Sequence, residues 1–116
     1  MLVERKKILN EDGSIGYIES IFKSDNILKT TYFPNINRLY ITFSRGGQTY
    51  SYSNVTPELY EEFEEAESHG KFFHKRINRN VNHPYRKEFT LYPSELIETK
   101  KIIEENLKEE DDAEND

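Results

Sequence analysis

The sequence predicts an α+β fold: a small antiparallel sheet, made of a meander and an N-terminal hairpin, packed by one to two short helices and followed by a C-terminal helix. Extended runs rich in β-branched and aromatic residues fill the first half of the chain, and segments with helix start signals fill most of the second. The length of 116 residues fits one domain. Eight Tyr and seven Phe indicate a core built from large rings.

The expected sheet begins with a hairpin. Residues 3–10 and 15–22 read as strands on either side of Asp12-Gly13, because a glycine supplies the positive φ that a tight hairpin turn demands. A meander follows, with strands expected over residues 26–33, 38–43 and 48–55. A further short strand is expected over residues 86–92.

The helices are expected from their start and stop signals. Thr56 is a predicted N-cap with Pro57 in the first helical position, and Gly70 stands where a left-handed residue commonly ends a helix. A second short helix is expected over residues 71–78. The last helix opens at Pro93-Ser94 and carries one apolar stripe, made of Leu96, Ile103 and Leu107.

These elements predict four regions: an N-terminal hairpin extension (1–23), a core domain (24–87), a C-terminal extension (88–108) and a disordered acidic tail (109–116). The whole formal net charge of −6 is accounted for by the tail acids Glu109, Glu110, Asp111, Asp112, Glu114 and Asp116. The apolar stripe of the C-terminal extension packs either on the domain itself or on another copy. A homo-oligomer, a dimer or a tetramer, is therefore expected.

Composition argues against several classes of protein. The chain has no Cys, its N-terminus is charged where a signal peptide would be apolar, and no run approaches the roughly 20 apolar residues of a membrane span. We expect a cytoplasmic protein with no membrane partner. The three His residues lack the spacing of zinc ligands, and no catalytic constellation is visible. No metal, cofactor or enzymatic activity is predicted.

Three groups of residues are candidates for ligand binding. Tyr50 and Tyr52 share one face of a strand, either as a stacking platform or as core. Arg45 and Gly46 either contact a phosphate or form only a hairpin turn. The basic segment 71–87, in which cations and rings interleave, is either a solvated charge run or a phosphate and base site. Its candidate residues are Lys71, His74, Lys75, Arg76, Asn78, Arg79, Tyr85 and Arg86.

From about residue 24 to residue 87 the chain resembles the KTSC domain, a short module found at the C-terminus of some lysyl-tRNA synthetases and as stand-alone bacterial and phage proteins. The matching residues include Tyr50-Ser51-Tyr52, residues 66–70, and Pro84-Tyr85-Arg86. Asn78 departs from the family, which usually carries Arg there. The resemblance implies a small sheet packed by a helix, a proposed RNA-binding role and no known enzymatic activity.

The stand-alone size, the Asn-rich and Lys-rich usage and the acidic tail also look similar to small phage proteins, some of which sequester nucleotide second messengers. The leading prediction is a non-enzymatic nucleotide-binding protein, a phage anti-defence sponge for a cyclic dinucleotide immune signal of the cGAMP type, acting in the host cytoplasm. An RNA- or tRNA-binding module that takes short RNA is the alternative. A protein–protein adaptor that docks an acidic partner is the second alternative.

Overall fold

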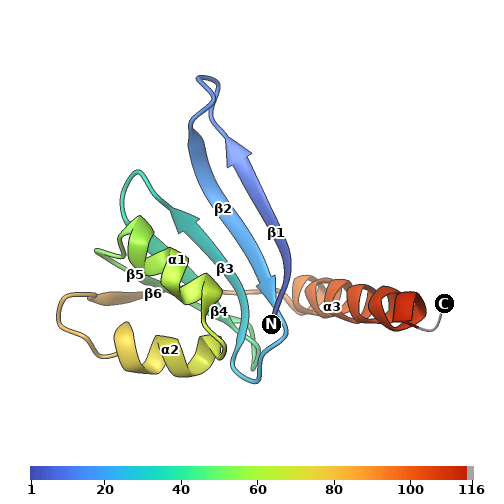
Figure 1. The fold of residues 1–116 in the computed structure, drawn as a ribbon. Coiled ribbons are helices and arrows are strands. Elements are labelled where there is room, and N and C mark those ends of the chain that lie inside the picture. The colour runs from blue at the N-terminus through green and yellow to red at the C-terminus, as the bar shows by residue number, and fades with distance from the viewer. Residues whose placement is uncertain (115–116) are drawn as a thin grey trace.

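The chain folds around one six-stranded antiparallel sheet whose strands lie in sequence order (Figure 1). The computed structural model describes the backbone of residues 1–114 and the side chains of residues 1–107. This is the α+β fold that the sequence predicts. The strands are β1 (Leu2–Leu9), β2 (Ile15–Phe22), β3 (Ile27–Phe33), β4 (Arg38–Phe43), β5 (Gln48–Tyr52) and β6 (Tyr85–Thr90).

The turns of the sheet form where glycine and asparagine permit them. Gly13 has a φ of 88°, and the carboxylate of Asp12 accepts a hydrogen bond from the backbone N–H of Ser14 at 2.9 Å, so the N-terminal hairpin closes as expected. Gly46 and Gly47 have φ values of 73° and 71° and join β4 to β5. The segment that contains Arg45 and Gly46 therefore forms a hairpin turn, one of its two interpretations.

Strand β5 is shorter than expected, because it ends at Tyr52 and not at residue 55. Asn54 adopts a left-handed φ of 59°, which turns the chain out of the sheet. Val55 then enters the core with 0% exposure, and its N–H donates to the carbonyl of Asn37 at 2.8 Å. The turn delivers Thr56 to its position as the cap of the first helix.

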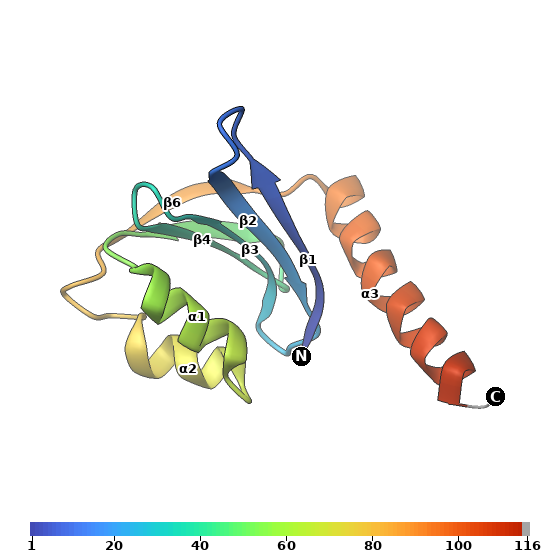
Figure 2. The ribbon, with the colours of Figure 1, turned by 45° about the horizontal axis from the view of Figure 1, so that its top comes forward.

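Two short helices, α1 (Pro57–Glu65) and α2 (His69–Arg76), cover one face of the sheet (Figure 2). Thr56 caps α1 as predicted, since its hydroxyl accepts from the N–H of Leu59 at 3.2 Å. The core between helices and sheet consists of aliphatic and aromatic side chains: Ile18, Phe22, Ile27, Tyr32, Leu39, Ile41, Tyr52, Val55, Tyr60, Phe63, Phe73 and Ile77.

The predicted boundary between the helices is wrong. Helix α1 ends at Glu65, and Gly70 lies in the first turn of α2 instead of ending α1. Ser68 caps α2 by accepting from the N–H of Lys71 at 3.3 Å. The buried His69 donates from Nε2 to the carbonyl of Glu64 at 3.1 Å, which satisfies an otherwise free carbonyl at the end of α1.

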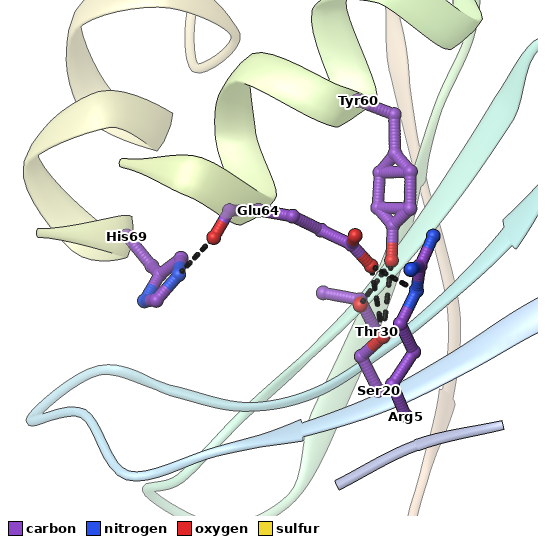
Figure 3. Close-up of polar contacts among 6 residues, drawn as sticks. All are labelled: Arg5, Ser20, Thr30, Tyr60, Glu64 and His69. Carbon is purple, nitrogen blue, oxygen red and sulfur yellow. Dashed lines mark hydrogen bonds and ion pairs between the residues drawn. The ribbon is translucent and has the colours of Figure 1, made fainter. Parts of the chain in front are cut away.

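Polar side chains also cross the interface between α1 and the sheet (Figure 3). The hydroxyl of Tyr60 lies 3.2 Å from that of Ser20 and 3.3 Å from that of Thr30. The carboxylate of Glu64 accepts from Ser20 at 3.1 Å and lies 3.3 Å from Nε of Arg5. This network ties the N-terminal hairpin to α1, because Arg5 and Ser20 belong to β1 and β2.

Helix α3 (Pro93–Glu114) lies beyond β1, apart from α1 and α2 (Figure 2). Thr99 and Ile102 line a small cavity with Glu19 and Ile21 of β2, and Leu96, Ile103 and Leu107 are partly buried. The face of α3 that carries Thr99 and Ile102 therefore lies against the chain's own sheet. The backbone of α3 continues through residues 109–114, so the helix runs past the boundary expected at residue 108, while the side chains of the acidic tail lie outside the described residues.

Within the described residues, none of the helices combines the length and the apolar character that crossing a membrane would require.

Candidate functional site

An aromatic pocket of about 310 Å³ opens between α2 and strands β4, β5 and β6. This volume is at the lower end of the range for small-molecule sites, about 300–1,000 Å³. Sheet residues form one wall, and α2 with the loop after it forms the other. The lining residues are Phe43, Tyr50, Tyr52, Phe73, His74, Asn78, Arg79 and Tyr85.

The apolar wall is built from rings that meet edge to face. The ring centroid of Tyr50 lies 6.0 Å from those of Phe43 and Tyr85, and that of Tyr52 lies 5.2 Å from that of Phe73. Tyr52 is only 4% exposed and belongs to the core, whereas Tyr85 is 64% exposed. Burial raises the pKa of the Tyr52 hydroxyl far above its usual range, and Tyr50 and Tyr85 add to the increase. Tyr50 and Tyr85 are therefore the rings that a ligand can reach.

The polar rim comes from α2 and the turn that follows it. The amide of Asn78 donates to Nδ1 of His74 at 3.1 Å, so these two side chains brace each other. Arg79 is exposed and has a left-handed φ of 58°. Within residues 1–107 its guanidinium takes part in no ion pair. The rim thus offers an unneutralised cation beside an aromatic wall.

The structure brings together half of the sequence-predicted site. Tyr50, Tyr52, His74, Asn78, Arg79 and Tyr85 line the aromatic pocket. Arg45 lines an adjoining cavity with Phe43 and His74, and Lys71 lines a third cavity that also includes His74. Gly46 lies in the exposed turn next to Arg45, with open space around its Cα.

Three predicted cations lie away from the pocket. Arg76 pairs with Glu62 at 3.2 Å and stacks 5.3 Å above the ring of Phe72. Arg86 pairs with Glu88 at 2.8 Å, and hydrogen bonds from Ser51 and Arg86 lower the pKa of that carboxyl. Lys75 is exposed on α2 and is not among the lining residues. Neighbours along a helix or strand point in different directions, which a linear basic segment does not reveal.

Sequence reasoning missed Phe43 and Phe73 as pocket residues. Phe43 ends β4 and Phe73 lies on α2, and their ring centroids are 5.7 Å apart across the interface. Alternation along β4 could have placed Phe43 on the face shared with Tyr50, because the two strands were both predicted.

Metal chemistry finds no support in the described part of the chain, where no group of three or more His, Asp or Glu side chains is arranged to hold an ion. The pocket instead combines rings, two amide or imidazole groups and one guanidinium. Such a lining suits a ligand with a planar ring and a negative charge.

A six-stranded antiparallel sheet with two short helices on one face and an aromatic pocket under the second helix defines a small α+β domain. Residues 23–80 match the family model of the KTSC domain, and this chain belongs to that family. The crystal structure of a KTSC domain protein from Yersinia pestis is similar, with a TM-score of 0.55 and 31% identity. That match covers 61% of this chain and 96% of the other. Comparison with the curated proteins found no match.

Proposed function

We propose that this protein binds a nucleotide in the aromatic pocket and releases it chemically unchanged. The observation that carries the proposal is the juxtaposition of two accessible rings, Tyr50 and Tyr85, with the guanidinium of Arg79, which has no ion-pair partner within residues 1–107. Stacking of a base on an aromatic side chain is worth about 1–3 kcal/mol. A charge-assisted contact from Arg79 to a phosphate would add to it.

The lining also supports binding without turnover. The described residues that form the pocket include no carboxylate, and their hydroxyls are phenolic. His74 has Asn78 as its partner and no acid or nucleophile within the lining set. A general acid–base pair for cleaving a phosphodiester would need a second titrating group within hydrogen-bond reach.

The specific form of the proposal is a phage anti-defence sponge that sequesters a cyclic dinucleotide in the cytoplasm. A pocket of about 310 Å³ fits one base better than two, so a ligand with two bases needs a second binding surface. A homo-oligomer would supply one by symmetry. Light scattering on the intact chain tests this assembly. A monomer with bound cyclic dinucleotide would contradict the homo-oligomer and leave the second base to the cavities that adjoin the pocket in the same chain.

The alternative function, binding of short RNA, draws on the cations that continue along α2 outside the pocket. Lys71, Lys75 and Arg76 are all exposed on this helix. They could follow a phosphate backbone whose terminal base occupies the pocket. Arg76 is already paired with Glu62, which weakens this alternative relative to a short ligand.

The test is a thermal-shift panel of mononucleotides, cyclic dinucleotides and short RNAs, because a ligand that binds only the native state raises the melting temperature. Tyr50→Ala and Arg79→Ala should each weaken binding of the best ligand by about tenfold or more. Lys75→Ala is the matched control, since it removes a cation of the same helix outside the pocket. Equal affinities in all three variants, or no shift with any nucleotide, would refute the proposal.

Tyr52→Ala is a less informative variant, although the sequence singles out this residue. Its ring is buried, and truncating a buried aromatic costs about 3–5 kcal/mol of folding free energy. Tyr52→Phe keeps the ring and tests only the hydroxyl.

Mass spectrometry of the ligand recovered after heat denaturation should return the input nucleotide, and a hydrolysed product would contradict non-catalytic binding.

A further inference from the structure

The aromatic pocket is one end of a longer groove along α2. A cavity of about 170 Å³ adjoins it and shares Phe43 and His74 with it. A third cavity, of about 500 Å³, shares Asp25, Asn26 and His74 with the second. His74 lines all three, so the cavities follow one another around a single side chain.

The chemistry of the groove changes along its length. The first cavity is aromatic, and the middle one carries the exposed guanidinium of Arg45 on the turn between β4 and β5. The far cavity is polar and contains both signs of charge. Its lining includes Lys23, Ser24, Asp25, Asn26, Glu67, Ser68 and Lys71.

The change from aromatic to cationic to mixed polar lining along the groove favours some nucleotides over others. A ring fits the aromatic end, and a phosphate fits the middle, where Arg45 and Arg79 are both free of ion pairs within residues 1–107. A chain of further phosphates would meet the carboxylates of Asp25 and Glu67, which repel it. A neutral group with hydroxyl or amino donors would instead find acceptors in those carboxylates.

We propose that the groove binds a dinucleotide: two nucleosides joined through phosphate. This inference rests on the proposed function and places both halves of its ligand in the groove of a single chain. One base stacks against Tyr50 and Tyr85, and the linking phosphate lies near Arg45 and His74. The second nucleoside occupies the far cavity, where Asp25 and Glu67 accept hydrogen bonds from its sugar hydroxyls.

The experiment compares four probes of one base by calorimetry: adenosine monophosphate, adenosine triphosphate, linear ApA and cyclic di-AMP, with a guanine set run in parallel. A dinucleotide should bind at least about tenfold more tightly than the monophosphate, because the far cavity adds hydrogen bonds to charged acceptors. The triphosphate should gain little over the monophosphate. Whether the linear or the cyclic form binds more tightly identifies the source of the dinucleotide.

Variants of the groove residues test whether the groove causes the tighter binding of dinucleotides. The pair Asp25→Asn with Glu67→Gln should reduce dinucleotide affinity by about tenfold and leave monophosphate affinity within about twofold. Arg45→Ala removes the cation beside the phosphate of either ligand and should weaken both. These side chains lie in exposed positions, so the variants are expected to fold. Lys75→Ala again serves as the control.

The outcomes separate the two proposals. Binding of the monophosphate as tightly as of both dinucleotides, or tightest binding of the triphosphate, would overturn the dinucleotide inference and leave nucleotide binding standing. Failure of all the probes in both base sets to bind would overturn both. A preference for dinucleotides that the carboxylate variants do not change would also overturn the assignment of the far cavity.

Discussion

Arg79 combines a strained backbone with a place on the rim of the pocket. Its φ of 58° puts a residue with a Cβ in the left-handed region, which costs about 1 kcal/mol relative to glycine. Strain of this kind persists where the surrounding structure enforces it, and it is common at binding sites. The side chain at this position is therefore a candidate for selection by function rather than by stability.

Arg79→Gly should accordingly separate folding from binding. The variant should be as stable as the parent or more stable by up to about 1 kcal/mol, because glycine adopts this φ without penalty. Its nucleotide affinity should fall by about tenfold. Urea denaturation and ligand titration measure the two quantities, and a loss of stability together with unchanged affinity would contradict the argument.

His69 makes the folded state sensitive to acid. Its ring is 4% exposed, Nδ1 has no hydrogen-bond partner among the described residues, and burial lowers its pKa despite the contact with the Glu64 carbonyl. The folded state therefore holds His69 neutral, while the unfolded chain takes up a proton below about pH 6.5. The free energy of unfolding should fall as the pH drops through 6.5 toward the lowered pKa.

His69→Gln isolates this contribution, since the amide can still donate to the carbonyl of Glu64 and does not titrate. Urea denaturation at pH 7.5 and at pH 5 should show a smaller loss of stability in the variant than in the parent. An equal loss would mean that other groups dominate the acid response, and the pKa shift of His69 would then be negligible.

The residues of the site could be predicted only in part. The alternation of Tyr50 and Tyr52 put both rings on the correct face, but only the packing of Phe73 against Tyr52 decides that Tyr52 is core. Arg76 and Arg86 belong to the same basic segment as Arg79, yet each pairs with a nearby carboxylate. Which carboxylate each arginine pairs with depends on the tertiary structure, and the order of charges along the sequence does not show it.

Among the elements, α3 has the clearest energetic role. It faces the side of the sheet opposite α1 and α2, and Ile21 of β2 is only 7% exposed beside Ile102. Removing the chain after Tyr92 should lower the free energy of unfolding by about 2 kcal/mol, because apolar surface returns to water. Chemical denaturation measures the change.

Removal of residues 109–116 alone is the matched control and should leave the unfolding midpoint unchanged. The deleted segment is almost entirely polar, so it has little apolar surface to bury. A large loss of stability in this control would show that the acidic tail contributes to the fold and would contradict its predicted disorder.

The elements were predicted more completely than the site. All six strands were expected, because each is a run that contains β-branched or aromatic residues and is bounded by turn signals. The error at Gly70 arose because a glycine after an amphipathic run usually ends a helix. Here Ser68 starts a new helix, and the buried His69 completes the end of the previous one.

At the scale of the molecule, salt should distinguish the two leading ligand classes. A ligand with one or two phosphates releases few counterions, so its affinity should fall by less than about tenfold between 50 and 200 mM salt. An RNA that contacts six or more phosphates should lose more than about a hundredfold. Titrations at the two salt concentrations with the tightest probe of each class provide the measurement.

The sequential order of the strands has a consequence for how the site comes into being. Strands β2 to β5 each pair with the preceding strand across a short turn, but β6 joins β5 only after the whole segment between Tyr52 and Tyr85 has been closed into a loop. Loop closure costs entropy that grows with length, so this pairing is expected to form last and to open first. Strand β6 is exposed along most of its length and carries Tyr85, a wall of the pocket. Amide protons of β6 should therefore exchange faster than those of β3 and β4, and a bound ligand should slow them most, because it fastens the last strand to the sheet.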